Sequence, residues 1–362
     1  MKVLILTCSL SKFDAVSNDI FLQKKILEEE GYQTKLYSIN SDEFYRPLVL
    51  SKSEIYRFLN DSSTIIIYHH STHFPGVEEI LKVHKGKKIF KYHNVTPKEF
   101  FEKFNSLHAG IVEEGRKQTE ILLTKYNWDK ILSASSYNQL EIFQFIKEKN
   151  IFSVLSPFHF IEDLKQMTLD SELVTTIRQV EFPVLFVGRV VPNKRIDWIL
   201  EVLYFYKKFY KQKIHLFIIG KELKEFENYN AVLRKTIQKF GLKNDITFVP
   251  NATPSHLFTF YKTCKAFLCL SEHEGFCMPI LEAQTLSLPI VALKKTAVKE
   301  TLGESYPGLE EYSPEVAVEF LHRICIDQRF RTALAEEGRK NSQEYTFEKM
   351  KSLFLDELKA IA

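Results

Sequence analysis

Two glutamates, Glu274 and Glu282, have the types and spacing that best suit binding chemistry in this chain. An apolar run at 265–270 comes just before them and predicts a short buried strand. Pro279 lies between them and predicts the first turn of a helix, where a missing N–H is tolerated. Gly275 lets the backbone of the strand-to-helix loop approach a ligand closely. The free N–H groups and the positive dipole end of such a helix favour a phosphate.

The position of these carboxylates predicts a second chemical group on the ligand. A carboxylate repels a phosphate, so Glu274 and Glu282 are better placed as acceptors for hydroxyl groups. Each has an ordinary explanation when taken singly: Glu282 as a partner of the helix dipole, and Glu274 as a solvated loop residue. Their spacing around one glycine favours a shared role. A ligand with both phosphate and hydroxyl groups fits the description of a nucleotide sugar.

The segment Glu274-Gly-Phe-Cys-Met-Pro-Ile-Leu-Glu282 resembles the Glu-x7-Glu signature of retaining glycosyltransferases of family 4, the glycosyl transferases group 1. The resemblance implies an α/β chain of the GT-B fold, with two doubly wound Rossmann-like domains facing each other across a cleft. It implies that Glu274 holds hydroxyls of the transferred sugar and that Glu282 holds the nucleotide ribose. Further contacts to the donor are implied for Gly275, Phe276, Cys277 and Met278. The usual signature has glycine where this chain has Cys277.

A second candidate anion site lies in the loop Gly188-Arg-Val-Val-Pro-Asn-Lys-Arg195, between an apolar strand and a predicted helix. Exposed Arg and Lys side chains are usually only solvated. However, Gly-Arg followed by Pro-x-Lys resembles the diphosphate-binding loop of the same family. The resemblance implies that Gly188, Arg189 and Lys194 contact the donor, and that the two cations stabilise the leaving diphosphate, as a metal ion does in other enzymes. Arg195 stands where the family often has glycine.

Short apolar runs separated by helical stretches predict a parallel, doubly wound sheet in each half of the chain. The expected strands cover residues 3–6, 33–38, 64–69, 88–92 and 130–134 in the first half, and 184–187, 215–220, 246–249, 266–270 and 289–293 in the second. In such sheets ligands bind at the carboxyl ends of the strands. No GxGxxG motif is present, which disfavours a dinucleotide-dependent oxidoreductase.

His93 directly follows the predicted strand at 88–92, in the segment Tyr92-His-Asn-Val-Thr-Pro97. A histidine in this position is structural about as often as functional. This segment, Asp14-Ala-Val-Ser-Asn18 and His69-His-Ser-Thr72 resemble acceptor-domain loops of a bacterial polysaccharide and lipopolysaccharide subgroup of the family. The resemblance implies that His93 lines the reaction centre. It also implies an acceptor-side position, with a capping or turn role as the alternative, for four residues of these loops: Asp14, Asn18, His70 and Asn94.

Three histidines, His69, His70 and His73, raise the question of a metal site. No carboxylate completes the set, and adjacent residues on a strand point to opposite faces of the sheet. We therefore predict no metal site, and the resemblance also implies metal-independent chemistry. No cofactor is expected beyond the UDP- or GDP-linked sugar itself.

The length of 362 residues suits two domains, and a composition with 45% hydrophobic and 26% charged residues suits two buried cores. We predict an acceptor domain at 1–170, a donor domain at 171–345 and a final helix at 346–362 that crosses back, with a polar linker at 162–179. The net charge of +3 does not favour nucleic acid. Five cysteines without metal-ligand spacing are expected to be reduced, as in the cytoplasm.

No apolar run reaches about 18 residues, so no membrane span is predicted, and the N-terminus does not have the pattern of a signal peptide. Phe100, Phe101, Phe104 and Leu107 fall on one face of a predicted helix. Such a stripe is usually core; the alternative is a lip that touches a lipid-linked acceptor or the membrane surface. The predicted location is therefore cytoplasmic, with a peripheral position on the inner face of the membrane as the alternative.

The activity implied by the resemblance is transfer of a hexosyl unit from a UDP- or GDP-sugar to an acceptor hydroxyl, with retained anomeric configuration. The acceptor would be a saccharide or a lipid-linked saccharide in cell-surface polysaccharide or lipopolysaccharide synthesis. The implied catalytic residues are His93, Arg189, Lys194 and Glu274. The alternatives are a sugar-nucleotide epimerase of the same fold and a catalytically silent partner subunit. A phosphorylase is disfavoured because it needs a much longer chain.

Overall fold

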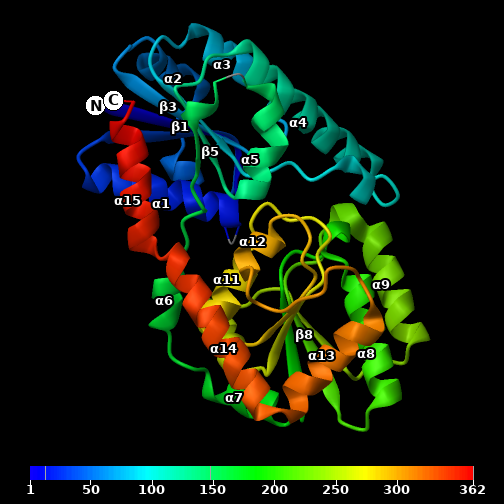
Figure 1. The fold of residues 1–362 in the computed structure, drawn as a ribbon. Helices are drawn as coiled ribbons and strands as arrows, with labels where there is room; N and C mark the ends of the chain where they lie inside the picture. Colours follow the sequence, from blue (N-terminus) through cyan, green and yellow to red (C-terminus); the bar gives the residue numbers. More distant parts are fainter. Residues whose placement is uncertain (13, 147, 362) are drawn as a thin grey trace. The chain divides into compact units, whose positions relative to one another are not determined.

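Parallel strands alternating with helices form two α/β units, as Figure 1 shows. The computed structural model describes residues 1–12, 14–146 and 148–361. Unit 1 comprises Met1–Lys98, Ala109–Phe160 and Tyr345–Ala362, and unit 2 comprises Glu99–His108 and Ile161–Glu344. Each unit has a sheet and a core of its own.

The sheet of unit 1 has parallel strands in the order β2-β1-β3-β4-β5-β6. They are β1 (Lys2–Leu10), β2 (Gln33–Ser41), β3 (Thr64–His70), β4 (Lys88–Tyr92), β5 (Lys130–Ser133) and β6 (Phe152–Val154). The helices of this part are α1 (Ala15–Glu29), α2 (Lys52–Leu59), α3 (Val77–Val83), α4 (Ser106–Lys125), α5 (Ser136–Ile142) and α15 (Phe347–Lys359). Ile5 of β1 pairs in register with Leu36 of β2 and Ile67 of β3, and all three are buried. Burial on both faces of the sheet explains the continuous apolar runs of β1 and β3, whereas the edge strand β2 alternates buried with more exposed residues.

Helix α15, at the C-terminal end of the chain, packs in the core of unit 1 beside α1 (Figure 1). Its buried residues Met350, Phe354 and Leu358 recur at helical spacing. The ring of Phe354 meets that of Phe158 edge-on, with the ring centroids 5.8 Å apart. The last helix is therefore part of the hydrophobic core that stabilises unit 1.

The sheet of unit 2 has parallel strands in the order β11-β10-β7-β8-β9. They are β7 (Phe182–Val187), β8 (Ile214–Ile219), β9 (Ile246–Val249), β10 (Ala266–Cys269) and β11 (Ile290–Ala292). The helices are α6 (Ile161–Lys165), α7 (Ser171–Arg178), α8 (Ile196–Phe209), α9 (Glu227–Lys239), α10 (Pro254–Thr263), α11 (Met278–Thr285), α12 (Val298–Leu302), α13 (Pro314–Ile326) and α14 (Gln328–Ser342). The direction of winding reverses between β7 and β10, as it does between β1 and β3 in unit 1. Ligands of open parallel sheets bind at such a reversal, outside the carboxyl ends of the strands.

The predicted fold class, α/β with two doubly wound parallel sheets, is confirmed. Each predicted strand is present: those at 88–92 and 246–249 have the predicted bounds, and the others have one or both ends shifted. The predicted linker at 162–179 contains most of α6 and all of α7. Asp170 caps α7, and its N–H donates to Oγ1 of Thr259 at 2.9 Å, which ties this segment to α10. The segment is polar because α7 buries only Ile177 fully.

The aromatic stripe that follows β4 packs with unit 2. Phe101 is buried and its ring lies 5.5 Å from the ring of Phe226, while Phe104 meets Tyr229 edge-on at 5.1 Å. Leu107, by contrast, is 81% exposed. Phe101 is therefore part of the core, as expected for such a stripe, whereas Phe104 is half-buried against Tyr229. No helix in the described ranges combines the length and apolar character needed to cross a membrane.

Gly220 follows β8 at a close approach to the loop after β7. A Cβ on Gly220 would lie 1.9 Å from the carbonyl oxygen of Gly188, and its φ is +156°. We expect Gly220→Ala to lower the free energy of unfolding of unit 2 by about 3 kcal/mol or more, because the backbone must move. Gly241→Ala is the matched control: its φ of +64° is also left-handed, but nothing lies within 4 Å of the added Cβ.

The control variant should lose only about 1 kcal/mol, the cost of a side chain at positive φ. Urea unfolding followed by the fluorescence of Trp198, in a Trp128→Phe background, measures both changes within unit 2. Equal losses in the two variants would contradict the close approach.

Candidate active site

Lys194 and Glu274 form a buried ion pair in unit 2, between β7 and β10, where the direction of winding of the sheet reverses. Lys194 follows β7 and Glu274 follows β10, and Nζ of the lysine lies 2.5 Å from Oε1 of the glutamate. Their side chains are 15% and 9% exposed. Burial lowers the pKa of Lys194, but the Glu274 carboxylate outweighs that effect and holds the pKa above its ordinary value. Lys194 is therefore a cation whose charge is neutralised inside the protein.

Hydrogen bonds among three loops hold this pair in place. Nδ2 of Asn193 donates to the carbonyl of His273 at 3.0 Å, and the N–H of Glu272 donates to the carbonyl of Asn193 at 3.0 Å. The loop after β11 joins them, since the N–H of Glu274 donates to Oγ1 of Thr296 at 2.9 Å. Each loop starts at the carboxyl end of a strand, so the parallel sheet sets the spacing between the loops.

The two residues that stand where the family motif has glycine both have left-handed backbone. Arg195 has a φ of 51° and precedes α8, and Cys277 has a φ of 79° and precedes α11. A side chain in this conformation costs about 1–2 kcal/mol. Arg195 offsets that cost, because its guanidinium pairs with Asp197 and Glu272 at 2.7 and 2.5 Å and lies 3.5 Å from the ring centroid of Trp198. The backbone path that glycine would favour is thus kept without glycine.

Unpaired donors lie in the loops around the ion pair. No described residue accepts a hydrogen bond from the backbone N–H of Cys277 or Met278 at the start of α11. Pro279 occupies the first turn of that helix, as the sequence predicts. Arg189 is exposed, and its side chain forms no ion pair or hydrogen bond within the part of the chain that the structure describes; its carbonyl accepts from the N–H of Val191. Two free N–H groups and two cations suit a ligand with more than one phosphate.

The other predicted donor residues lie in the same loops. Gly188 has a φ of 152°, and a Cβ there would lie 3.3 Å from the ring of Phe186. Phe276 is buried, and its carbonyl accepts a hydrogen bond from Oγ1 of Thr301 on α12. Gly275 precedes it in the turn. The structure therefore brings the predicted donor loops together at one end of the sheet.

Glu282 lies on α11, the helix that follows the loop of Glu274 in unit 2. Its Oε2 accepts a hydrogen bond from the hydroxyl of Tyr261 at 2.6 Å. Burial raises the pKa of Glu282 above its ordinary value, and the Tyr261 hydrogen bond opposes that rise. No described Lys or Arg pairs with Glu282, so its second oxygen remains a candidate acceptor for a ligand hydroxyl.

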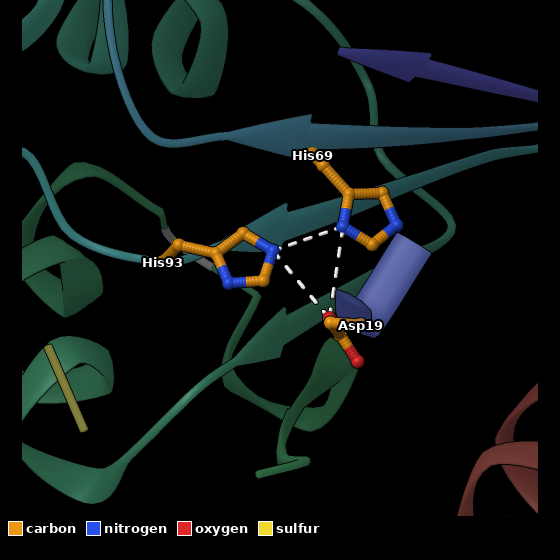
Figure 2. Close-up of side chains that lie close together, drawn as sticks. All are labelled: Asp19, His69 and His93. Carbon is orange, nitrogen blue, oxygen red and sulfur yellow. Dashed lines mark hydrogen bonds and ion pairs between the residues drawn. The ribbon is translucent and has the colours of Figure 1, made fainter. Parts of the chain in front are cut away.

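His93 in unit 1 faces three buried polar side chains, from α1, β3 and β4. Figure 2 shows that His93, His69 and Asp19 point toward one another. Nε2 of His93 lies 2.9 Å from Nδ1 of His69 and 3.6 Å from Oδ2 of Asp19, and that oxygen lies 3.2 Å from Nζ of Lys91. Burial lowers the pKa of His69 well below its ordinary value and that of His93 to about 4. Both rings are therefore neutral near pH 7.

His70 packs in the core, on the face of the sheet opposite to His69. Its Nδ1 lies 2.7 Å from the hydroxyl of Tyr68, and its Nε2 lies 2.8 Å from Oγ1 of Thr119. Full burial lowers the pKa of His70 to about 3. Both ring nitrogens have protein partners, so the structure gives His70 no free group for the predicted acceptor-side role.

The remaining predicted acceptor-side residues lie near the start of α1 and after β4. Oδ2 of Asp14 accepts from the N–H of Ser17 at 3.0 Å and caps α1, which is the alternative role expected for it. Asn94 has a φ of 79° and donates to Oδ1 of Asn138 at 2.9 Å, so it has a turn role. Asn18 is half-buried and makes no side-chain hydrogen bond with a described residue.

Among the residues that the structure describes, two groups of three side chains lie close enough to share a cation. The groups, each with ligand atoms within 4.8 Å of one another, are Asp19, His69 and His93 in unit 1, and Cys269, Glu274 and Cys277 in unit 2. An ammonium group already lies against the carboxylate of each, Lys91 at 3.2 Å and Lys194 at 2.5 Å. Because this charge neutralises the only carboxylate of the group, a divalent ion is disfavoured in both. The predicted absence of a metal stays a prediction.

Sequence reasoning does not identify four residues of these clusters: Asp19, Lys91, Tyr261 and Thr296. Lys91 could have been identified from the sequence, because a lysine inside an apolar strand indicates a buried, negatively charged partner. Asp19 directly follows the segment of α1 that the family resemblance singles out. Tyr261 and Thr296 could not be identified from the sequence, because they come from α10 and the loop after β11. They meet the predicted donor residues Glu282 and Glu274 only in the folded structure.

The buried histidines make the stability of unit 1 depend on pH. His69, His70 and His93 bind protons more weakly in the folded chain, so below pH 6.5 or thereabouts the unfolded state takes up protons first. Stability is therefore complete above that pH and is lost as the pH falls toward the folded pKa values. We expect the free energy of unfolding to fall by about 1.4 kcal/mol per pH unit for each such histidine.

Urea unfolding between about pH 7 and pH 5 measures this loss, with Trp128 as the only tryptophan in a Trp198→Phe background. In His70→Asn the free energy of unfolding should fall less steeply with decreasing pH, by the amount that one buried histidine contributes. An unchanged pH dependence in that variant would contradict the buried neutral state.

The left-handed backbone of Cys277 predicts an inverted order of two small substitutions. Cys277→Gly and Cys277→Ala both remove the thiol, but only alanine keeps a side chain at positive φ. We expect the glycine variant to be more stable than the alanine variant by about 1 kcal/mol, in urea unfolding followed by Trp198 fluorescence. An alanine variant as stable as the glycine variant would show that the backbone is not strained there.

Known proteins match both the sequence and the fold. Residues 174–341 match the family model of glycosyl transferases group 1. The amylovoran biosynthesis glycosyltransferase AmsD of Erwinia amylovora is 23% identical over 372 residues, with 95% of each chain covered. An uncharacterised glycosyltransferase of Methanocaldococcus jannaschii is 21% identical over 305 residues, which cover 80% of this chain and 83% of that protein.

A solved structure of HepE from Anabaena, in complex with UDP and glucose, has a similar fold. Its TM-score is 0.72 at 17% identity, with 99% of this chain and 100% of that chain covered. At this identity the likeness concerns the fold alone, while the match at 174–341 includes the loops of both Lys194 and Glu274. The chain therefore has the two-domain fold of the GT-B glycosyltransferases, and its residues 174–341 are similar to glycosyl transferases group 1.

Proposed function

We propose that this protein is a glycosyltransferase that moves a hexosyl unit from a nucleoside-diphosphate sugar to an acceptor hydroxyl. The observation that carries the proposal is the buried Lys194–Glu274 pair, set beside the unpaired N–H groups of Cys277 and Met278. A cation, free backbone donors and a carboxylate in one loop cluster match the phosphates and hydroxyls of such a donor. The group 1 family match at 174–341 supports the same reaction class.

Binding of the donor would exchange the partners of the ion pair. The negatively charged diphosphate would pair with Lys194 and with the exposed Arg189. It would thereby replace Glu274 as the ionic partner of Lys194. The freed Glu274 carboxylate then accepts hydrogen bonds from hydroxyls of the sugar, which keep it paired in its buried position. This exchange of partners at Lys194 and Glu274 thus requires a ligand that carries both phosphate and hydroxyl groups.

Glu282 would hold the hydroxyls of the nucleotide ribose. Its Oε2 is held by Tyr261, and this hydrogen bond orients the carboxylate so that the other oxygen can accept from the ligand. Ribose offers two neighbouring hydroxyl donors for that purpose. The base is not specified by these residues, and UDP and GDP are the candidates.

The residues of unit 2 would act mainly on the leaving group. Negative charge grows on the diphosphate as the sugar departs, and Lys194, Arg189 and the start of α11 stabilise it without a metal ion. We propose that the anomeric configuration is retained through attack on the same side as the departing diphosphate, which takes the acceptor proton. Excluding water favours transfer over hydrolysis.

The acceptor and pathway are proposed by analogy with the relatives. AmsD is named for amylovoran biosynthesis, and HepE was solved with UDP and glucose. By analogy we propose a UDP-sugar as the first donor to test, and a saccharide or lipid-linked saccharide of cell-surface polysaccharide synthesis as the acceptor. The cytoplasmic location and the contact with the membrane surface remain predictions.

Lys194→Met tests the proposed donor site, because it removes the charge and keeps most of the side chain. We expect the affinity for UDP or GDP, measured by isothermal titration calorimetry, to fall about 10- to 100-fold, the worth of a charge-assisted hydrogen bond. Lys194→Met/Glu274→Gln should show the same loss without leaving a buried charge unpaired. Lys207→Met, which removes an exposed partner of Asp245, is the matched control.

Wild-type affinity in both Lys194 variants would remove the diphosphate site. A product assay with labelled donor separates the alternatives: conversion of the donor without an acceptor would indicate an epimerase. Binding of neither nucleotide by the wild type would favour a silent subunit.

A further inference from the structure

Four polar side chains form a continuous buried group in unit 1, which we call the His93 cluster: Lys91, Asp19, His69 and His93 (Figure 2 draws the last three). The side chains of Lys91, Asp19 and His69 have no exposed surface, whereas that of His93 is 3% exposed. Oδ1 of Asp19 accepts from the N–H of Phe158 at 2.8 Å, which fixes the carboxylate. His93 is therefore the member of the cluster that can meet a substrate.

The charges inside the cluster already cancel. Nζ of Lys91 lies 3.2 Å from Oδ2 of Asp19, so one ammonium and one carboxylate balance each other. Protonation of His69 or His93 would add an unbalanced buried charge, and a divalent cation would add two. Burial lowers the pKa of both histidines, although Asp19 and Asp14 act in the opposite sense on His93. Each ring is thus neutral and carries one N–H.

The hydrogen bond between the rings indicates where each proton lies. Nδ1 of His69 and Nε2 of His93 are 2.9 Å apart, so one donates and the other accepts. Nε2 of His69 is buried without a partner in the described ranges. An unpaired N–H in that place is costlier than an unpaired lone pair. The proton of His69 is therefore on Nδ1, near Oδ2 of Asp19 at 3.7 Å, and His93 accepts at Nε2.

We propose that Lys91, Asp19 and His69 are positioning residues that hold His93 as a neutral ring with an Nδ1–H donor for an oxygen of the bound substrate. Nδ1 of His93 makes no hydrogen bond with a described residue, and it is not among the fully buried unpaired atoms. A donor at this atom suits a hydroxyl or phosphate oxygen, and it cannot act there as a general base. Only the identity of the substrate rests on the proposed function.

Nitrogen-15 NMR of histidine-labelled protein tests the tautomer without any need for activity. The signals of His93 are identified by their loss in His93→Gln. We expect a neutral ring protonated at Nδ1 for both His93 and His69. Protonation of His93 at Nε2 or at both nitrogens near neutral pH would overturn the proposal. So would tight binding of one equivalent of Zn²⁺ that shifts the signals of both rings.

A kinetic test uses Asp19→Asn/Lys91→Met, which removes both charges and leaves neither one buried alone. The new amide can donate to Nδ1 of His69, which moves the protons of both rings to Nε2 and leaves His93 without its donor. We expect kcat to fall about tenfold or more, while the affinity for the nucleoside diphosphate is unchanged. His84→Gln, at another buried histidine of unit 1, is the control and should change neither value.

A double variant with wild-type kcat, or with the His93 tautomer unchanged, contradicts the positioning role. A wild-type protein that shows the expected tautomer but transfers no sugar contradicts the proposed function and leaves the tautomer assignment in place. The spectroscopic and kinetic results therefore separate the two claims.

Discussion

The buried ion pair of Lys194 and Glu274 is the interaction around which the loops of unit 2 are arranged. Withdrawing two charges from water costs several kcal/mol per ion, roughly, and only close contact and satisfied neighbours compensate for it. The 2.5 Å contact and the hydrogen bonds of Asn193 and Thr296 provide both. A ligand that separates the pair must offer negative charge to the lysine and hydrogen-bond donors to the glutamate. The proposed donor, a diphosphate joined to a polyol, would offer both.

The same constraint explains the unusual backbone of the surrounding loops. Lys194 reaches Glu274 because the chain turns through a left-handed residue directly after it, at Arg195, and Cys277 makes a similar turn at the start of α11. Both positions cost stability, and glycine would be cheaper at each. Asp197, Glu272 and Trp198 stabilise Arg195. The cost of its left-handed backbone is therefore offset by contacts that do not involve the Lys194–Glu274 pair. The loops hold their shape through side chains in a chain that has only 12 glycines.

The sequence is informative where a pattern is local and silent where partners come from distant segments. The strands at 88–92 and 246–249 are predicted with their observed limits because each is a short run rich in apolar residues, whereas β6 has three residues, too few for a pattern. The donor loops are predicted because their signature lies within short segments. Asp19, Lys91 and His69 meet only when α1, β3 and β4 are assembled, so spacing along the chain could not group them. For the same reason His70 is predicted on the acceptor side, although its ring faces the core and lies against the hydroxyls of Tyr68 and Thr119.

A crystal structure of the protein with a bound nucleoside diphosphate would show whether Lys194 and Glu274 exchange partners when the donor binds. We expect a phosphate oxygen within hydrogen-bonding distance of Nζ of Lys194, and Oε1 of Glu274 withdrawn from that atom. A bound nucleotide whose phosphates lie elsewhere, with the contact between Lys194 and Glu274 still at 2.5 Å, would contradict it.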